Sequence, residues 1–154
     1  MSTPEIRVLI LIGSESDREI MSRTVGVLSE LDVACRLEVA SAHRSPRRVR
    51  ELVEAAEKAG VRVFVCGAGM AAHLAGAVAA LTTRPVIGVP LAGSALSGFD
   101  SLLSTVQMPK GVPVATVAIG EHGAVNAGIL AAQILALSDA GLAGRLRAQY
   151  RRDL

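Results

Sequence analysis

The chain has 154 residues, of which 51% are hydrophobic and 19% are charged, and its formal net charge is +2. This length suits one domain, and the composition excludes a disordered chain, which would combine low hydrophobicity with a high net charge. Aromatic residues make up only 2% of the chain, whereas it contains 25 Ala and 15 Gly, so a nucleic-acid partner is not expected. The small aliphatic residues predict that backbones approach closely, and the apolar surplus predicts that either a membrane or a subunit interface covers part of the surface.

Strand-like and helix-like segments alternate along the chain. Residues 6–12 form a continuous apolar run, typical of a strand buried on both faces. Further strands are predicted over residues 33–40, 61–66, 85–89 and 112–119. Helices are predicted over residues 17–31, 46–59, 70–82, about 98–107 and 123–138. The second of these helices has Ser45 as its expected N-cap, Pro46 as its first residue and Gly60 at its end. Five apolar strands alternating with helices predict an α/β domain with a doubly wound parallel sheet.

Two regions are expected in this organisation. Residues 1–138 are predicted to form a single α/β domain, and residues 139–154 a C-terminal helical tail. Leu142, Leu146 and Tyr150 recur at helical spacing within the tail, between arginines. We expect this amphipathic helix to pack on a neighbouring subunit. The alternative is a basic arm for a membrane surface or a nucleic acid.

A membrane segment and a disulfide are both disfavoured by the sequence. The 21 residues between Arg62 and Arg84 carry no formal charge, which is long enough to span a bilayer. However, this stretch begins with β-branched residues, stops at glycines and resumes with alanines, so a strand, a turn and a helix explain it better. Cys35 and Cys66 have no metal-ligand spacing, and they are predicted to be reduced residues of a cytoplasmic protein, with Cys66 buried and inert rather than a thiol nucleophile. The apolar surplus is therefore assigned to subunit contacts.

The turns after the strands are the places to look for chemistry, because ligands of parallel sheets bind beyond the carboxyl ends of the strands. The first turn contains Ser14, Ser16 and Asp17 at a helix N-terminus, where free N–H groups and hydroxyls favour an anion. Asp17 would contact a sugar hydroxyl or cap the helix. A simple N-cap is the alternative for the whole turn. The glycine and lysine patterns of dinucleotide and nucleoside-triphosphate sites are missing from it.

The second turn, residues 41–46, places a histidine beside an arginine. Arg44 can hold a phosphate through two hydrogen bonds, and His43 titrates near neutral pH, so it can give or take a proton. The alternative is a surface loop whose charged side chains are solvated.

The third turn runs from Gly67 to Leu74, and its glycines would let the backbone approach a ligand. His73 lines the same pocket or is a core histidine bonded to a carbonyl, and its position alone favours the core histidine. The fourth turn, from Pro90 to Asp100, is long and rich in Gly and Ser, as functional loops often are. Three His and two scattered Cys make a catalytic metal improbable.

Four segments, in order, carry a resemblance to a known family. GSESD, SAHRSP, GAGMAAHLAG and SGFDSLLSTVQMPKGVPVATVAIG follow successive strands and resemble the PurE family, class I. The match covers about residues 6–138. It implies a flavodoxin-like, three-layer αβα sandwich around a five-stranded parallel sheet. It further implies an isomerase of purine biosynthesis that converts N5-carboxyaminoimidazole ribonucleotide into 4-carboxy-5-aminoimidazole ribonucleotide, a small ribonucleotide substrate, with no metal and no organic cofactor. The family assembles as a homo-octamer with active sites at subunit junctions.

The resemblance also assigns roles to residues. His43 matches the catalytic histidine of the family. The substrate-binding positions are Ser14, Ser16, Asp17, Ser41, Ala42, Arg44, Ala68, Gly69, His73 and Leu74. Ser41 and Arg44 match phosphate-side residues. This chain departs from the familiar third segment, GAGGAAHLPG, because Met70 replaces a glycine and Ala75 replaces a proline.

The sequence leaves two alternative functions. The class II relatives carboxylate aminoimidazole ribonucleotide directly with CO2, but they differ in the third turn and usually carry lysine where Arg44 stands. A flavodoxin-like nucleotide-binding module without catalysis would explain the first turn, but not a His-Arg turn and a Gly-His turn at one sheet edge.

Overall fold

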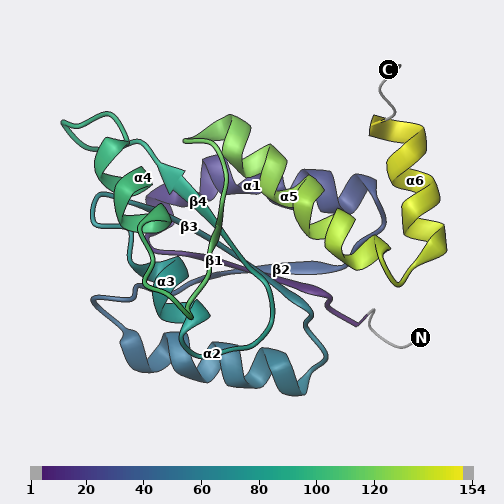
Figure 1. The fold of residues 1–154 in the computed structure, drawn as a ribbon, viewed down its shortest axis with the longest axis horizontal. Coiled ribbons are helices and arrows are strands. Elements are labelled where there is room, and N and C mark those ends of the chain that lie inside the picture. Colours follow the sequence, from purple (N-terminus) through teal and green to yellow (C-terminus); the bar gives the residue numbers. More distant parts are fainter. Residues whose placement is uncertain (1–4, 151–154) are drawn as a thin grey trace.

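Five parallel strands form one central sheet in the computed structural model, which describes residues 5–150 (Figure 1). Their order across the sheet is β2-β1-β3-β4-β5. The strands are β1 (Val8–Ile12), β2 (Cys35–Val39), β3 (Val63–Gly69), β4 (Val86–Leu91) and β5 (Ala115–Thr116). The order reverses direction at β1, and β1 and β3 are neighbours in the middle of the sheet. The predicted five-stranded parallel sheet is therefore confirmed.

Helices cover both faces of the sheet and complete three layers (Figure 1). They are α1 (Arg18–Glu30), α2 (Pro46–Lys58), α3 (Leu74–Ala79), α4 (Phe99–Val106), α5 (Glu121–Ala136) and α6 (Ala140–Tyr150), with a short 3-10 turn, η1 (Glu15–Asp17), before α1. Figure 1 shows α1 and α5 on one face, and α2 and α3 on the other. Helix α4 shares the face of α3, because a Cβ on Gly88 would contact both Thr105 of α4 and Ala75 of α3.

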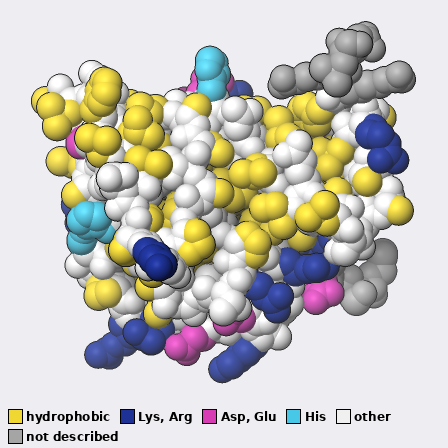
Figure 2. All heavy atoms as spheres, in the orientation of Figure 1, with side chains coloured by type: hydrophobic (Ala, Val, Ile, Leu, Met, Phe, Trp, Pro, Cys, Tyr) yellow, Lys and Arg dark blue, Asp and Glu magenta, His cyan; other side chains and the backbone are white. Residues whose placement is uncertain are grey.

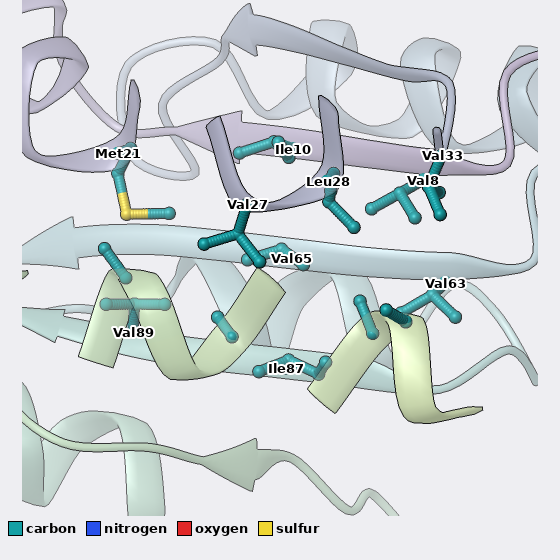
Figure 3. Packing of buried hydrophobic residues seen from close by; sticks show 14 of the residues in the cluster. Val8, Ile10, Met21, Val27, Leu28, Val33, Val63, Val65, Ile87 and Val89 are labelled. Carbon is teal, nitrogen blue, oxygen red and sulfur yellow. The ribbon is translucent and has the colours of Figure 1, made fainter. Parts of the chain in front are cut away.

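Alternate residues of β1 enter two separate hydrophobic cores, which explains the unbroken apolar run in the sequence. Val8 and Ile10 pack in the core beneath α1 and α5 (Figure 3). Leu9 and Leu11 pack in the core beneath α2 and α3. All five residues of β1 are fully buried, as expected for a parallel strand covered on both sides.

Small residues let α1 and α5 approach closely, as the composition predicted. A Cβ added to Gly128 of α5 would lie 2.9 Å from Val27 Cβ and 3.2 Å from the Thr24 carbonyl oxygen. The Thr24 hydroxyl donates a buried hydrogen bond to the Ala124 carbonyl over 2.7 Å. Buried alanines continue along this side of α5 at Ala124, Ala127, Ala131 and Ala132. Glycine and alanine, rather than large aromatic side chains, therefore fill the contact between the two helices and allow a short distance between their backbones.

Most predicted elements shift by one to three residues at an end, and two of them differ more from the structure. The strand predicted over 112–119 is reduced to the short edge strand β5, and Pro113, which has no N–H to donate, lies before its start. The chain still runs beside β4, since Val117 N–H donates to Gly88 over 3.1 Å and Gly120 N–H to Pro90 over 2.8 Å. The helix predicted from residue 70 begins only at Leu74, because β3 continues to Gly69 and a turn follows it.

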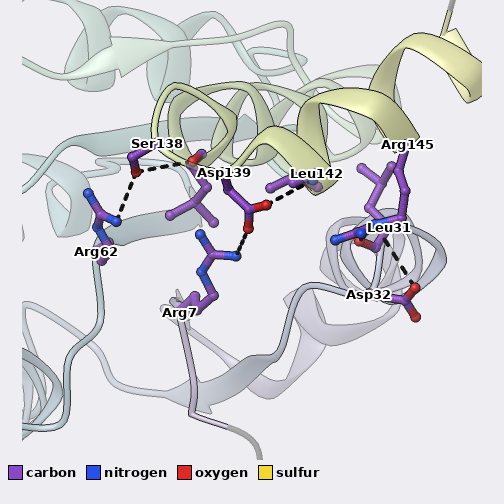
Figure 4. Close-up of polar contacts among 9 residues, drawn as sticks. Arg7, Leu31, Asp32, Arg62, Ser138, Asp139, Leu142 and Arg145 are labelled. Atoms are coloured by element: carbon purple, nitrogen blue, oxygen red, sulfur yellow. Dashed lines mark hydrogen bonds and ion pairs between the residues drawn. The ribbon is translucent and has the colours of Figure 1, made fainter.

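The C-terminal helix α6 packs on its own chain (Figure 4). Leu142 is fully buried against α1 and α5, and Leu146 and Tyr150 pack beside it, so the predicted apolar side of this helix is confirmed. Arg145 donates to the Leu31 carbonyl over 2.9 Å, and Asp139 pairs with Arg7 over 2.7 Å. Contact of the tail with a neighbouring subunit stays a prediction, and its last residues, 151–154, lie outside the described part of the chain. Within residues 5–150, no helix is long and apolar enough to cross a membrane.

Candidate active site

The turns that follow β1, β2, β3 and β4 meet at one edge of the sheet and line an open cavity of about 480 Å³. This edge lies at the carboxyl ends of the strands, where the sequence placed the chemistry. All eleven residues predicted for the site line the cavity. They are Ser14, Ser16, Asp17, Ser41, Ala42, His43, Arg44, Ala68, Gly69, His73 and Leu74.

The first turn is both a helix cap and a wall of the cavity. The Ser14 side chain accepts a hydrogen bond from the Ser16 N–H, and the Asp17 carboxylate accepts one from the Ser14 N–H over 3.1 Å. This reciprocal pair is a capping box, so the N-cap alternative is confirmed. The two serine hydroxyls lie 3.0 Å apart. Partial burial raises the pKa of Asp17, and the bond from Ser14 opposes that rise. The same turn therefore caps the helix and lines the cavity.

The second turn is closed by two serines, and this closure positions His43 and Arg44. Ser45 Oγ accepts a hydrogen bond from the Ser41 N–H and donates to the Ser41 carbonyl, both over 3.2 Å. Ser41 Oγ accepts from the Arg44 N–H over 3.2 Å. Ser45 is the N-cap residue of α2 and Pro46 is its first residue, as expected, but the Ser45 hydroxyl bonds within the turn and makes no cap hydrogen bond to the helix. His43 and Arg44 are exposed at the cavity.

The third turn is fastened to α4 by Ser104. The Ala72 N–H donates to Ser104 Oγ over 2.9 Å, and Ser104 Oγ lies 3.4 Å from the Met70 carbonyl. A Cβ on Gly69 would lie 3.3 Å from the Leu91 carbonyl oxygen, so this position favours glycine where β3 approaches β4. His73 is the N-cap residue of α3 and is exposed at the cavity. The core-histidine interpretation is therefore wrong, because the helix begins at Leu74 and leaves His73 at its entrance.

His43 and His73 are in direct contact across the cavity edge. Nε2 of His43 lies 2.7 Å from Nδ1 of His73, and the rings meet edge to face with centroids 4.8 Å apart. A hydrogen bond between two imidazoles needs one protonated and one unprotonated nitrogen. One of the two facing nitrogens therefore donates and the other accepts. His43 is thus held in contact with a second histidine from the next turn.

Six further residues line the cavity without having been predicted as site residues: Gly13, Met70, Ala71, Leu91, Ala92 and Gly93. Gly13, Met70 and Ala71 belong to turns that the sequence singled out, and Leu91, Ala92 and Gly93 come from the start of the long fourth turn. Cys66 lies beneath the site and is fully buried, which raises the pKa of its thiol and agrees with the inert interpretation. Among the described residues, no three His, Cys, Asp or Glu side chains are grouped as a metal site requires. A metal-free reaction stays a prediction.

Comparison with known proteins gives a consistent picture. A family model described as AIR carboxylase matches residues 7–153. The N5-carboxyaminoimidazole ribonucleotide mutase of Bacillus subtilis is 56% identical over 137 residues, which are 89% of this chain and 85% of the relative. The mutase of the same name from Escherichia coli K12 is 51% identical over 91% of this chain and 83% of the relative. A crystal structure of Treponema denticola PurE has a TM-score of 0.85 at 25% identity, covering 93% of this chain and 88% of that one.

Proposed function

The chain belongs to the AIR carboxylase family, and we propose that it acts as an N5-carboxyaminoimidazole ribonucleotide mutase with His43 as its catalytic residue. This proposal rests on the mutase relatives, which are identical to this chain at about half of the aligned positions over about nine-tenths of its length. As a mutase it is an isomerase of purine biosynthesis, since the carboxyl group moves from a nitrogen to a carbon of one molecule. The fold is flavodoxin-like, in agreement with the PurE structure.

The cavity offers a separate wall for each part of such a ribonucleotide. Arg44 and the hydroxyls of Ser14 and Ser16 supply positive charge and donors for the phosphate. The Asp17 carboxylate is suited to accept a hydrogen bond from a ribose hydroxyl, because a carboxylate beside a phosphate would be repelled. Gly69 leaves room for a flat ring to approach the backbone beside the two histidines.

The reaction in this cavity divides into two steps around one histidine. In the first step the bond between N5 and the carboxyl carbon breaks, its electron pair stays on N5, and the His43 imidazolium supplies a proton to N5. This leaves aminoimidazole ribonucleotide and CO2. In the second step C4 of the ring attacks CO2, and the neutral His43 removes the C4 proton. His43 ends in its starting state, so no external proton is consumed.

Two structural features support this assignment. His43 is exposed at the cavity and lies 2.7 Å from His73, so it is within reach of the substrate and its ring is oriented. An acid that later acts as a base works best with a pKa near the working pH. Holding CO2 beside C4 makes the second step effectively unimolecular, so the reaction avoids the entropy cost of capturing CO2 from solution.

A homo-octamer in the cytoplasm is proposed from the family resemblance and from the surface. Figure 2 shows hydrophobic side chains gathered over the α4 region and along α5. Leu96, Phe99, Leu103 and Val106 are exposed on α4 and on the loop before it. A symmetric assembly would bury such patches, and it would account for an apolar content that one small core leaves exposed.

The role of His43 is tested by His43→Asn. This variant removes the titrating group, and Asn keeps hydrogen-bonding capacity at a similar size. We expect turnover of N5-carboxyaminoimidazole ribonucleotide to be lost, while calorimetry shows binding of aminoimidazole ribonucleotide within a few-fold of the unmodified protein. Substantial residual mutase activity would refute the assignment of His43. Loss of binding together with activity would show that His43 holds the substrate rather than moving its proton.

A further inference from the structure

Met70 has a backbone conformation that glycine normally supplies. Its φ angle is +54°, in the left-handed region where a Cβ crowds the following carbonyl oxygen. Asp32 and Ser97 are the other non-glycine residues with positive φ in the described part of the chain. Both have short polar side chains, which can form local hydrogen bonds and tolerate this region better than methionine does.

The strained conformation is enforced by neighbouring contacts. Ser104 of α4 accepts a hydrogen bond from the Ala72 N–H over 2.9 Å, and its hydroxyl lies 3.4 Å from the Met70 carbonyl and 2.6 Å from the Asp100 carbonyl. The turn is therefore held to α4 by the Ala72 N–H, two residues after Met70, while the Met70 carbonyl lies close to the same hydroxyl. A strained residue that its surroundings hold in place is a feature often found at functional sites.

The Met70 side chain is exposed, although it borders the cavity. It is 63% exposed and lines the same cavity as His43, His73 and Gly69. An unbranched thioether is apolar, flexible and able to fit irregular space. Backbone strain and an exposed apolar side chain thus coincide at the wall formed by the third turn. The backbone strain costs folding stability, and its place on the cavity wall points to a role once the cavity is filled.

We propose that Met70 closes the carboxyl-transfer end of the cavity over bound substrate and retains CO2 between the two steps. This inference rests on the proposed mutase function. After the N5–carbon bond breaks, CO2 either forms the bond to C4 or escapes to water. Escape leaves aminoimidazole ribonucleotide, which has taken a proton from His43 at N5. His43 then regains a proton from solvent. An apolar side chain over the gas slows escape without changing the proton transfers.

The experiment measures how the products divide. N5-carboxyaminoimidazole ribonucleotide is supplied in buffer with ¹³C-bicarbonate, and the amounts of aminoimidazole ribonucleotide, unlabelled product and labelled product are determined by mass spectrometry. A reaction without enzyme corrects for spontaneous decarboxylation. In Met70→Gly we expect a several-fold larger share of aminoimidazole ribonucleotide and of labelled product. Met70→Leu keeps an apolar side chain at this position, so it should give the same proportions of products as the unmodified protein. Leu137→Ala is the matched control, because Leu137 is an exposed apolar residue outside the cavity lining.

Two further readouts separate retention of CO2 from a structural role. Glycine relieves the left-handed strain, so Met70→Gly should unfold at a temperature no lower than the unmodified protein, and its mass by light scattering should be unchanged. An unchanged product division in a folded Met70→Gly would overturn the inference. So would a change in mass, because it would place Met70 at a subunit contact. A lack of mutase activity in the unmodified protein would instead overturn the proposed function.

Discussion

Gly128→Ala adds a single methyl group at the place where α5 crosses α1. The new Cβ would lie 2.9 Å and 3.0 Å from Val27 Cβ and Cγ1, and 3.2 Å from the Thr24 carbonyl oxygen. Val27 is branched at Cβ and the Thr24 atom is backbone, so no flexible chain end can move aside. The two helices must separate by a few tenths of an ångström. This separation would also lengthen the buried 2.7 Å hydrogen bond from Thr24 to Ala124.

Opposing contributions set the expected size of the effect. Alanine is favoured over glycine inside a helix by about 1 kcal/mol. Overpacking a tight contact costs about 1–3 kcal/mol, and a weakened hydrogen bond forfeits part of about 0.5–1.5 kcal/mol. We therefore expect the free energy of unfolding to fall by about 1–2 kcal/mol. Gly26→Ala is the matched control, because Gly26 lies in α1 with nothing within 4 Å of its added Cβ, and it should gain up to about 1 kcal/mol.

The assay is unfolding by urea and by heat, followed by far-ultraviolet circular dichroism because the chain has no Trp. All proteins are compared at one concentration, since association shifts apparent stability. The two variants should differ in unfolding temperature by roughly 2–12 °C, because 1 kcal/mol corresponds to about 2–4 °C at this size. If Gly128→Ala gained as much stability as Gly26→Ala, close packing of α1 on α5 through small residues would be refuted.

Two further predictions follow from the titrating groups. The pKa of Asp139 is lowered, first by the hydrogen bond from the Leu142 N–H and then by Arg7. Because the folded pKa lies below the unfolded one, the stabilisation is present above the ordinary carboxylate pKa and is lost as the pH falls through the folded value. In thermal melts the unmodified protein should unfold at a higher temperature than Asp139→Asn at neutral pH, and this difference should shrink in acid. A difference in unfolding temperature that does not depend on pH would contradict this. Burial raises the pKa of the Cys66 thiol more than that of the half-buried Cys35. Maleimide should therefore label Cys35 first in the folded protein and Cys66 only on unfolding. Early labelling of Cys66 would contradict this and show that its strand opens.

Hydrophobic pattern alone predicted the order and class of the elements, because a parallel strand buried on both faces leaves an unbroken apolar run such as residues 6–12. The edge strand was predicted too long. Its pairing depends on Pro113 and on distances to β4, which periodicity does not encode. The early start predicted for α3 has a similar cause. Met70 and Ala71 suit a helix by propensity, but the Ala72 N–H is bonded to Ser104, which lies 32 residues further along the chain.

The site was predicted by its turns more fully than by single side chains. All strand ends of a parallel sheet meet at one edge, so the motif residues were bound to converge. What a residue touches there was harder to predict. Ser45 is the N-cap residue of α2, but its hydroxyl bonds Ser41 rather than a helix N–H, and His73 pairs with His43 instead of joining the core. Both outcomes depend on distances within or between turns that sequence spacing leaves open.

The choice between two substrates tests the central claim most directly. The protein is supplied in one reaction with N5-carboxyaminoimidazole ribonucleotide in buffer free of bicarbonate, and in another with aminoimidazole ribonucleotide and bicarbonate. Formation of 4-carboxy-5-aminoimidazole ribonucleotide is followed in both, with His43→Asn as the inactive reference. A mutase converts the first substrate efficiently and the second poorly. Efficient turnover of only the second would identify a carboxylase that uses CO2 directly, and turnover of neither would leave a nucleotide-binding protein.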